Sequence, residues 1–223
     1  MIFNLTIRQF GNLTMKVLLF CRYALSLILP SGGLLFALSG TVSAQTYTDT
    51  IAEFRKHYTE DLLADKRAPI KHSQVSSLNF FPPDRNYCVW ASFRESPGSV
   101  PFKIPTHSGK QKPFREYGVL TFILNNNLYS LHAYQSIDMM NDAAHKDDLF
   151  IPFNDETNYE ATYGGGRYID LSIKDIIDGK VLLDFNKCYN PYCAFADGYS
   201  CPIPPAENKL HTEIKAGEKM FTH

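Results

Sequence analysis

The feature that most constrains the fold is an alternation of apolar and polar residues that recurs in short runs after residue 87. The clearest case runs from Gly118 to Leu124, is interrupted by Asn125-Asn126-Asn127, and continues from Leu128 to Tyr134. Alternation with a period of two places every second side chain of a strand on the same face. Asparagine tolerates the positive φ of tight turns, so the sequence predicts a β-hairpin here.

Similar runs predict further strands, and one segment predicts a helix. Ile51, Phe54, Tyr58 and Leu62 are three or four residues apart, which is the spacing of one helical face. We therefore expect a helix over 48–64, capped by Thr48 or Asp49, and a tight turn at Asp178-Gly179. The expected strands cover residues 87–93, 114–124, 128–135, 149–153, 168–173 and 181–185. This order predicts an all-β domain with one N-terminal helix, arranged as an antiparallel barrel or sandwich.

The first 44 residues have the features of a signal peptide, with Met1 or Met15 as the start. An apolar run from Ala24 to Leu38 precedes Val42-Ser43-Ala44, a site of small residues that a signal peptidase recognises. Cleavage after Ala44 would leave a single β-rich domain over 45–223, located in the periplasm or secreted and without a stable membrane span. The alternative is an uncleaved anchor over residues 17–38, which Arg22 and Pro30 interrupt.

Composition excludes two broad classes of protein. The chain is 44% hydrophobic and 20% charged, so it can bury a core and does not resemble a disordered chain. It has 22 basic and 23 acidic residues, and this lack of a basic excess argues against binding to nucleic acid. The 13 tyrosines and 16 phenylalanines favour β-structure.

Four cysteines remain after removal of Cys21, and their number fits an oxidising compartment. We expect a disulfide between Cys193 and Cys201, which closes a short loop. A second bridge between Cys88 and Cys188 is geometrically possible. A metal site and a free functional thiol at Cys193 are the alternatives, although the spacing matches no zinc motif.

The most unusual residues lie between Pro152 and Asn208. Two strings stand out, Tyr-Gly-Gly-Gly-Arg-Tyr over 163–168 and Cys-Pro-Ile-Pro-Pro-Ala-Glu-Asn over 201–208. In combination they resemble the bacterial family called domain of unknown function 1684, and the similarity extends from Phe54 to Glu218. The resemblance implies an exported or small soluble protein, and the family supplies no catalytic residue. Cys193 and Cys201 match positions of the family pattern, whereas Cys88 and Cys188 do not, which weakens the second bridge.

The glycine string gives the strongest hypothesis for a ligand site. Gly164, Gly165 and Gly166 permit positive φ and close approach, so their amides together with Arg167 could bind an anion. The alternative is a glycine bulge at a barrel corner, with Arg167 paired to Asp155, Glu160 or Asp170. The predicted ligand-binding residues are Gly164, Gly165, Gly166, Arg167, Tyr163, Tyr168, Tyr189 and Asn190, although these tyrosines could equally be core residues.

From these patterns we expect an exported binding module for a small polar or anionic ligand. Its mouth would combine the glycine turn with the Cys193–Cys201 loop. The alternative is a hydrolase or transferase that uses Cys193 as nucleophile or Asp155 and Glu160 as acid and base, and a third interpretation is a purely structural envelope protein. The histidines are scattered, and His132 is expected to be a packed or surface residue. No cofactor or metal motif is recognisable, so none is expected.

Overall fold

The computed structural model describes residues 46–222, so the predicted signal peptide and its cleavage site lie outside the described residues. The elements are one α-helix, seven strands and short 3-10 turns. Their bounds are α1 (Tyr47–Ala64), β1 (Cys88–Glu95), β2 (Phe102–Pro105), β3 (Gln111–Leu124), β4 (Asn127–Ser136), β5 (Asp148–Phe153), β6 (Arg167–Ser172) and β7 (Lys180–Asp184), with 3-10 turns η1 (His72–Ser77), η2 (Arg85–Tyr87), η3 (Ile173–Asp175), η4 (Phe185–Lys187), η5 (Tyr192–Ala194) and η6 (Ala206–Asn208).

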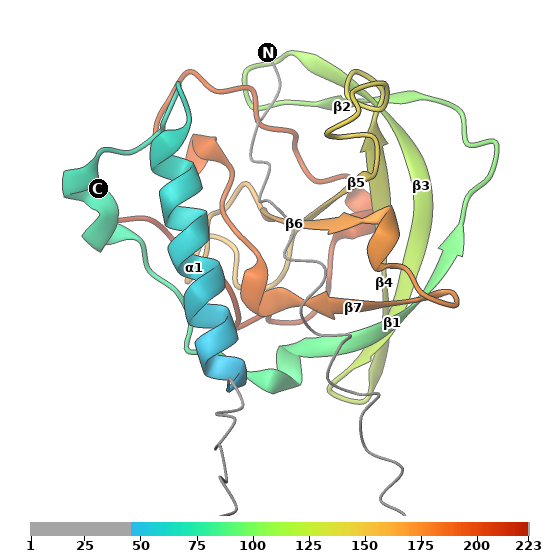
Figure 1. The fold of residues 1–223 in the computed structure, drawn as a ribbon, viewed down its shortest axis with the longest axis horizontal. Coiled ribbons are helices and arrows are strands. Elements are labelled where there is room, and N and C mark those ends of the chain that lie inside the picture. Colours follow the sequence, from blue (N-terminus) through green and yellow to red (C-terminus); the bar gives the residue numbers. More distant parts are fainter. Residues whose placement is uncertain (1–45, 223) are drawn as a thin grey trace, which may run out of the picture.

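The strands form one antiparallel sheet in the order β6-β5-β4-β3-β1-β7, with β2 paired to β3 beside this path. The sheet curls into a half-barrel, and α1 stands at its open side with the C-terminal segments between the two (Figure 1). The predicted fold class is therefore confirmed. The expected strands are all present within a few residues, and β2 is the one that the sequence pattern missed.

Local signals explain several element boundaries. Asn125 and Asn126 have φ of 49° and 63°, as the hairpin prediction required, and Asp178-Gly179 also turns with positive φ. The helix cap is one correction: Thr46 is the N-cap, and its hydroxyl and Asp49 form a capping box. Thr48 lies one residue inside the helix, and Asp49 contributes as the third helical residue.

Besides a minor cluster of Ile104, Phe114 and Tyr134, two apolar clusters divide the interior. The larger fills the concave side of the sheet, with Leu120, Leu131 and Val181 among its fully buried members. The smaller lies under α1, where Tyr58 and Leu62 pack with tyrosines from β6 and from the segment after β7. We call the opposite, convex side of the sheet the outer face.

Candidate functional site

Arg167 starts β6 and lies entirely inside the molecule, with none of its side chain exposed. Its Nη2 donates to Oδ2 of Asp155 at 2.7 Å and to the carbonyl of Ile214 at 2.8 Å. Its Nη1 donates to the carbonyls of Ala216 at 2.5 Å and Glu218 at 3.2 Å. A buried charge is tolerated when it is paired and hydrogen-bonded in this way. The structure therefore gives Arg167 the structural ion pair that the sequence left as the alternative to a ligand contact.

Both carboxylate oxygens of Asp155 also accept hydrogen bonds inside the protein. Its Oδ1 accepts hydrogen bonds from the amides of Thr157 at 2.9 Å and Ile214 at 3.1 Å, while Oδ2 binds Arg167. Glu160, the other member of the proposed acid–base pair, is exposed in the following turn. With every oxygen of Asp155 occupied inside the protein, the geometry does not support a catalytic pair here.

The three glycines pack closely against their neighbours. Gly166 has φ of +87°, and a Cβ there would lie 2.7 Å from the carbonyl oxygen of Phe153. A Cβ on Gly165 would lie 2.7 Å from Nε2 of His107. The ring of His107 packs against that of Tyr163, with 6.1 Å between the ring centroids. Chain geometry and packing therefore explain these glycines, and anion binding by the amides of Gly164, Gly165 and Gly166 stays a prediction.

The remaining predicted ligand residues lie inside the smaller apolar cluster or at its edge. The hydroxyl of Tyr168 donates to the carbonyl of Pro202 at 2.5 Å, and that of Tyr189 donates to Asp170 at 2.6 Å. The side-chain amide of Asn190 donates to the carbonyl of Lys219 at 2.7 Å. All three side chains are buried. Tyr168 and Tyr189 are therefore core residues, as the alternative interpretation of the sequence expected.

Glu218 is a buried carboxyl beside Asn190. Its Oε2 accepts from the amide of Asn190 at 2.7 Å and from the hydroxyl of Tyr58 at 2.9 Å. Burial outweighs these hydrogen bonds and the nearby Arg167, and it raises the pKa of Glu218 to about 8. This group is therefore protonated at neutral pH, and it acts as a neutral link between α1 and the C-terminal segment.

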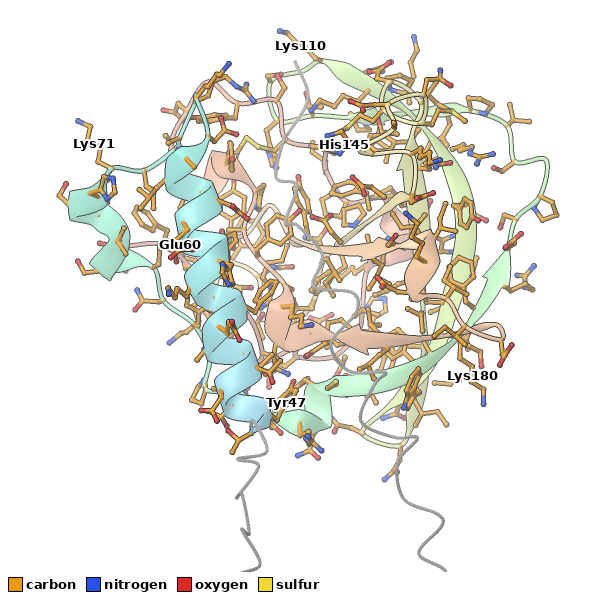
Figure 2. All side chains as sticks on the ribbon, viewed as in Figure 1. Tyr47, Glu60, Lys71, Lys110, His145 and Lys180 are labelled. Carbon is orange, nitrogen blue, oxygen red and sulfur yellow. A yellow bond between two sulfur atoms is a disulfide. The ribbon has the colours of Figure 1, made fainter. Side chains whose placement is uncertain are left out.

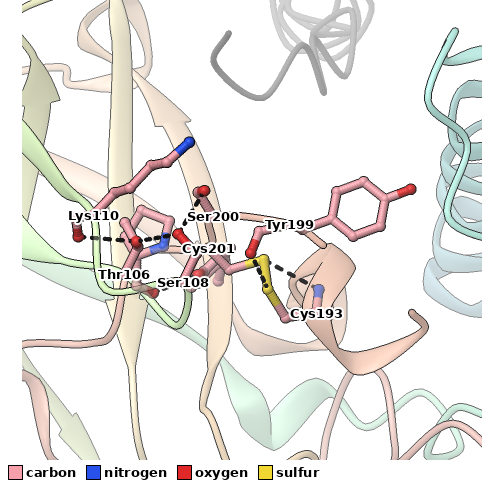
Figure 3. The surroundings of a disulfide bond; sticks show 9 residues. Thr106, Ser108, Lys110, Cys193, Tyr199, Ser200 and Cys201 are labelled. Carbon is pink, nitrogen blue, oxygen red and sulfur yellow. Dashed lines mark hydrogen bonds between the residues drawn. A yellow bond between two sulfur atoms is a disulfide. The ribbon is translucent and has the colours of Figure 1, made fainter. Parts of the chain in front are cut away.

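Cys193 and Cys201 form the predicted disulfide, with their Cα atoms 6.2 Å apart. Figure 3 shows the bridge beside the turn between β2 and β3. There the amide of His107 donates to the carbonyl of Cys201 at 3.0 Å, and the hydroxyls of Ser108 and Ser200 lie 2.7 Å apart. The bridge therefore joins η5 to the proline-rich segment, which hydrogen bonds attach to the β2–β3 turn, and it leaves Cys193 without the thiol that the nucleophile hypothesis requires.

Cys88 and Cys188 are free cysteines, so the second bridge is absent from the described residues. Cys188 is buried, and its Sγ lies 3.5 Å from the carbonyl of Ala216. Burial raises the pKa of the Cys188 thiol to about 11, and that of Cys88 to the same value. Both thiols are protonated at neutral pH and are therefore poor nucleophiles.

A polar pair on the outer face was not expected from the sequence. Nδ1 of His132 on β4 lies 2.7 Å from Oε2 of Glu116 on β3, and the hydroxyl of Ser96 donates to Oε1 of the same carboxylate. Burial raises the pKa of Glu116, but the hydrogen bonds from Ser96 and His132 outweigh this effect and leave it below its ordinary value. The side chains of His132 and Glu116 are 26% and 28% exposed, so this pair is open to solvent.

A β-bulge brings this pair together. The register shifts between Glu116 and Gly118, so Glu116 lies opposite Tyr134 while Val119 lies opposite His132. One extra residue in a strand reverses which side chains face the core. Without the bulge, Glu116 would share the inner face with Leu120, and the sequence alternation alone therefore assigns it to the wrong side.

The C-terminal segment supports the pair from behind. The side chain of Asn208 accepts from the amide of His132 at 2.7 Å and donates to its carbonyl at 2.9 Å. It also donates to the carbonyl of Pro152 on β5 at 2.8 Å. Glu207, the preceding residue, accepts from the hydroxyl of Tyr134 at 2.9 Å. Both residues belong to the Cys-Pro-Ile-Pro-Pro-Ala-Glu-Asn string, whose role here is to hold β4.

A shallow hollow of about 150 Å³ adjoins Glu116. Its lining combines charged and hydroxyl groups, namely Glu95, Ser96, Pro97, Arg115, Glu116 and Tyr117. Arg115 is oriented by two hydrogen bonds to Oε1 of Gln135, at 2.9 Å from Nε and 2.6 Å from Nη2. The hollow therefore presents hydrogen-bond donors and acceptors in fixed positions.

No group of three or more His, Cys, Asp or Glu side chains within residues 46–222 is arranged to hold a metal ion. In that same part, no helix has both the length and the apolar character needed to cross a membrane.

Comparison with known proteins gives a family match and a structural match. The profile of the family described as "Protein of unknown function (DUF1684)" matches residues 73–219. A solution NMR structure of an uncharacterized protein from Haloarcula marismortui has a TM-score of 0.59 and 31% sequence identity. That match covers 77% of this chain and 94% of the other. The search among curated proteins found no match.

Proposed function

The chain belongs to the DUF1684 family of proteins of unknown function, and from that premise we propose that it is an exported binding module for a small polar ligand. The proposed site is the hollow that Glu116 lines, with His132 bonded to the Glu116 carboxylate. The observation that carries the proposal is the oriented pair of these two residues, which is about a quarter exposed, with the backbone of His132 held by Asn208.

The pair has the chemistry of a recognition site. His132 lies outside the lining of the hollow, and its Nδ1 contact orients the Glu116 carboxylate that lines it. Arg115 adds a cation and Glu95 an anion to the lining of the hollow. With a volume of about 150 Å³, the hollow suits a small ligand.

Binding is favoured over catalysis because the candidate catalytic groups are engaged in contacts within the protein. Cys193 is in a disulfide, and Asp155 is bonded to Arg167 inside the protein. An enzyme that uses Cys193 would need the disulfide to open, and one that uses Asp155 with Glu160 would need the ion pair with Arg167 to open. The oriented Glu116–His132 pair needs no rearrangement to accept a ligand.

Export is supported by the disulfide and by the leader. Disulfides persist in oxidising compartments, and the apolar run followed by Val42-Ser43-Ala44 fits a cleaved signal peptide. We expect N-terminal sequencing of protein from the cell envelope to begin at Gln45. An N-terminus at Met1 or Met15 in the membrane fraction would contradict cleavage.

The ligand proposal is tested by mass spectrometry of small molecules that co-purify with the protein. We expect a bound species in the wild type that is lost in Glu116→Gln and in His132→Gln. Asp148→Asn is the matched control, because Asp148 forms a similar 2.8 Å contact with His145 away from the hollow. Retention of the same species in both outer-face variants, or its loss in Asp148→Asn as well, would contradict the assignment.

A further inference from the structure

The hollow at Glu116 is lined by charged groups of both signs. Arg115 is the cation of the lining, and Glu95 and Glu116 are its anions. Among residues 46–222, no ion pair joins Arg115 to either carboxylate, although all three groups line the same hollow. Opposite charges that share a small site without neutralising each other are complementary to a ligand that carries both charges.

The guanidinium of Arg115 has one edge occupied and one edge open. Nε and Nη2 both donate to Oε1 of Gln135, so a single amide oxygen takes the edge that these two nitrogens form. Cζ of Arg115 lies 5.6 Å from the centroid of the Tyr117 ring, which further restricts the guanidinium plane. Within the part of the chain that the structure describes, no group bonds to the edge formed by Nη1 and Nη2. That edge offers two parallel N–H donors, the arrangement that binds a carboxylate through both of its oxygens.

The anionic side of the hollow consists of Glu95 and Glu116. Glu95 is exposed at the end of β1, and its carboxylate has no hydrogen bond or ion pair with another described residue. The Glu116 carboxylate is held by Ser96 at Oε1 and by His132 at Oε2, and each oxygen can accept a second hydrogen bond. An ammonium group only donates hydrogen bonds, so it matches this side of the hollow.

We propose that the ligand of this hollow is a small zwitterion, whose carboxylate binds Nη1 and Nη2 of Arg115 and whose ammonium group binds Glu95 and Glu116. A free amino acid with a small side chain is the class of molecule that carries both groups within a short span. The volume of about 150 Å³ suits a molecule of this size. The inference rests on the proposed function, because it names the ligand class of the same site.

The same charges disfavour ligands with a single charge or with none. A simple anion would pair with Arg115 but would lie beside Glu95 and Glu116, and a simple cation would lie beside Arg115. Like charges at close range weaken binding and so contribute to specificity. A neutral ligand would displace water from Arg115 and Glu95 without supplying an opposite charge.

The test is a titration of the full exported chain, followed by NMR through the backbone amide shifts. The probes are glycine, L-alanine and L-serine, with acetate and methylammonium as the matched ions of single charge. We expect saturable shifts at Ser96, Arg115 and Glu116 with at least one of the amino acids. The dissociation constants of acetate and methylammonium should be at least about tenfold higher than that of this amino acid.

Two variants separate the two sides of the hollow. Arg115→Gln removes the carboxylate partner, so the dissociation constant of the amino acid should rise at least about tenfold. Glu95→Gln should raise it by a smaller factor, about three- to fivefold, because Glu116 still pairs with the ammonium group.

Arg85→Gln and Glu60→Gln are the matched controls, because each removes an exposed charge of the same sign outside the hollow. Arg85 precedes β1, at the opposite end of that strand from Glu95. Glu60 is labelled on α1 in Figure 2, and Figure 1 shows α1 on the other side of the molecule from β3. Both controls should bind the amino acid like the wild type, and circular dichroism should show that all variants keep the fold.

Three results would overturn the zwitterion. The first is the absence of saturable shifts with all three amino acids. The second is binding of acetate or methylammonium as tight as that of the amino acid. The third is a co-purified species with one charge or none that is lost in Glu116→Gln and in His132→Gln, and this result would keep the proposed site while it excludes the ligand class.

Discussion

The Arg167–Asp155 pair and the Glu116–His132 pair are both 2.7 Å contacts between a basic side chain and a carboxylate, yet their surroundings are opposite. The first has no exposed side-chain area, and the guanidinium also binds three backbone carbonyls. The second is about a quarter exposed and lies beside a hollow. Arginine after three glycines attracts attention in the sequence, but its contacts are with the protein itself. The pair that lies beside a hollow is the one that the sequence did not single out.

The largest expected effect is the loss of the interior pair. Arg167→Ala leaves Asp155 charged and buried without its partner, so we expect the free energy of unfolding to fall by about 3–5 kcal/mol. Urea denaturation with His132→Gln as the exposed control measures the contrast between the two pairs. Near-native stability of Arg167→Ala would contradict the structural role and return Arg167 to the ligand hypothesis.

The disulfide gives the next largest effect, because it anchors the segment that supports the outer pair. Cys193 and Cys201 are eight positions apart, and chain-entropy estimates for such a loop give roughly 2–3 kcal/mol. We expect Cys193→Ser/Cys201→Ser to lose this amount in urea denaturation. The free energy of unfolding of the wild type should fall by a similar amount when the disulfide is reduced, whereas the double variant should not respond to reductant. A double variant that is as stable as the oxidised wild type would contradict the estimate.

Glu218 provides a pH test of the interior. Its pKa of about 8 in the folded protein is above the ordinary 4.5, so the folded state holds this proton more tightly than the unfolded chain. Its contribution is complete below about pH 4.5 and is lost as the pH rises through about 8, with a slope of up to about 1.4 kcal/mol per pH unit. Glu218→Gln should therefore flatten the fall in stability between pH 5 and 9. An unchanged slope in that variant would assign the pH dependence to other groups.

The smallest effect is expected at the outer pair, and it has the opposite sign. The pKa of Glu116 is lowered, so its contribution is present above the ordinary carboxyl pKa and is lost as the pH falls. An exposed pair contributes at most about 1 kcal/mol, and Glu116→Gln should lie within that margin at pH 7. A larger loss in urea denaturation would show that this pair also has a structural role, and the comparison of the two regions would fail.

Much of the fold follows from local signals in the sequence. The hairpin at Asn125-Asn126 and the 3–4 spacing over Ile51, Tyr58 and Leu62 predicted elements that the structure contains. The short β2 was missed because its four residues, Phe102–Pro105, are too few to establish alternation and end in proline.

The candidate site was less predictable, for two physical reasons. The carbonyls that bind Arg167 lie 47 to 51 positions further along the chain, at Ile214, Ala216 and Glu218, so no local pattern reveals them. The bulge before Gly118 moves Glu116 to the other face, and alternation cannot show it. A glycine inside a strand was the available signal for that bulge. The predicted disulfide, in contrast, depends on a short separation and was confirmed.

The position of Asn208 determines when this protein can complete its fold. Its amide binds both His132 on β4 and Pro152 on β5, next to the one residue pair, Tyr134 and Phe150, that joins these strands. This seam cannot close before residue 208 has been synthesised, and the carbonyl partners of Arg167 follow still later. An emerging chain therefore lacks the hydrogen bonds at this seam and at Arg167 until residue 218 has been synthesised. A chain exported as we propose would therefore complete this part of the fold only after residues 208–218 have been exported as well.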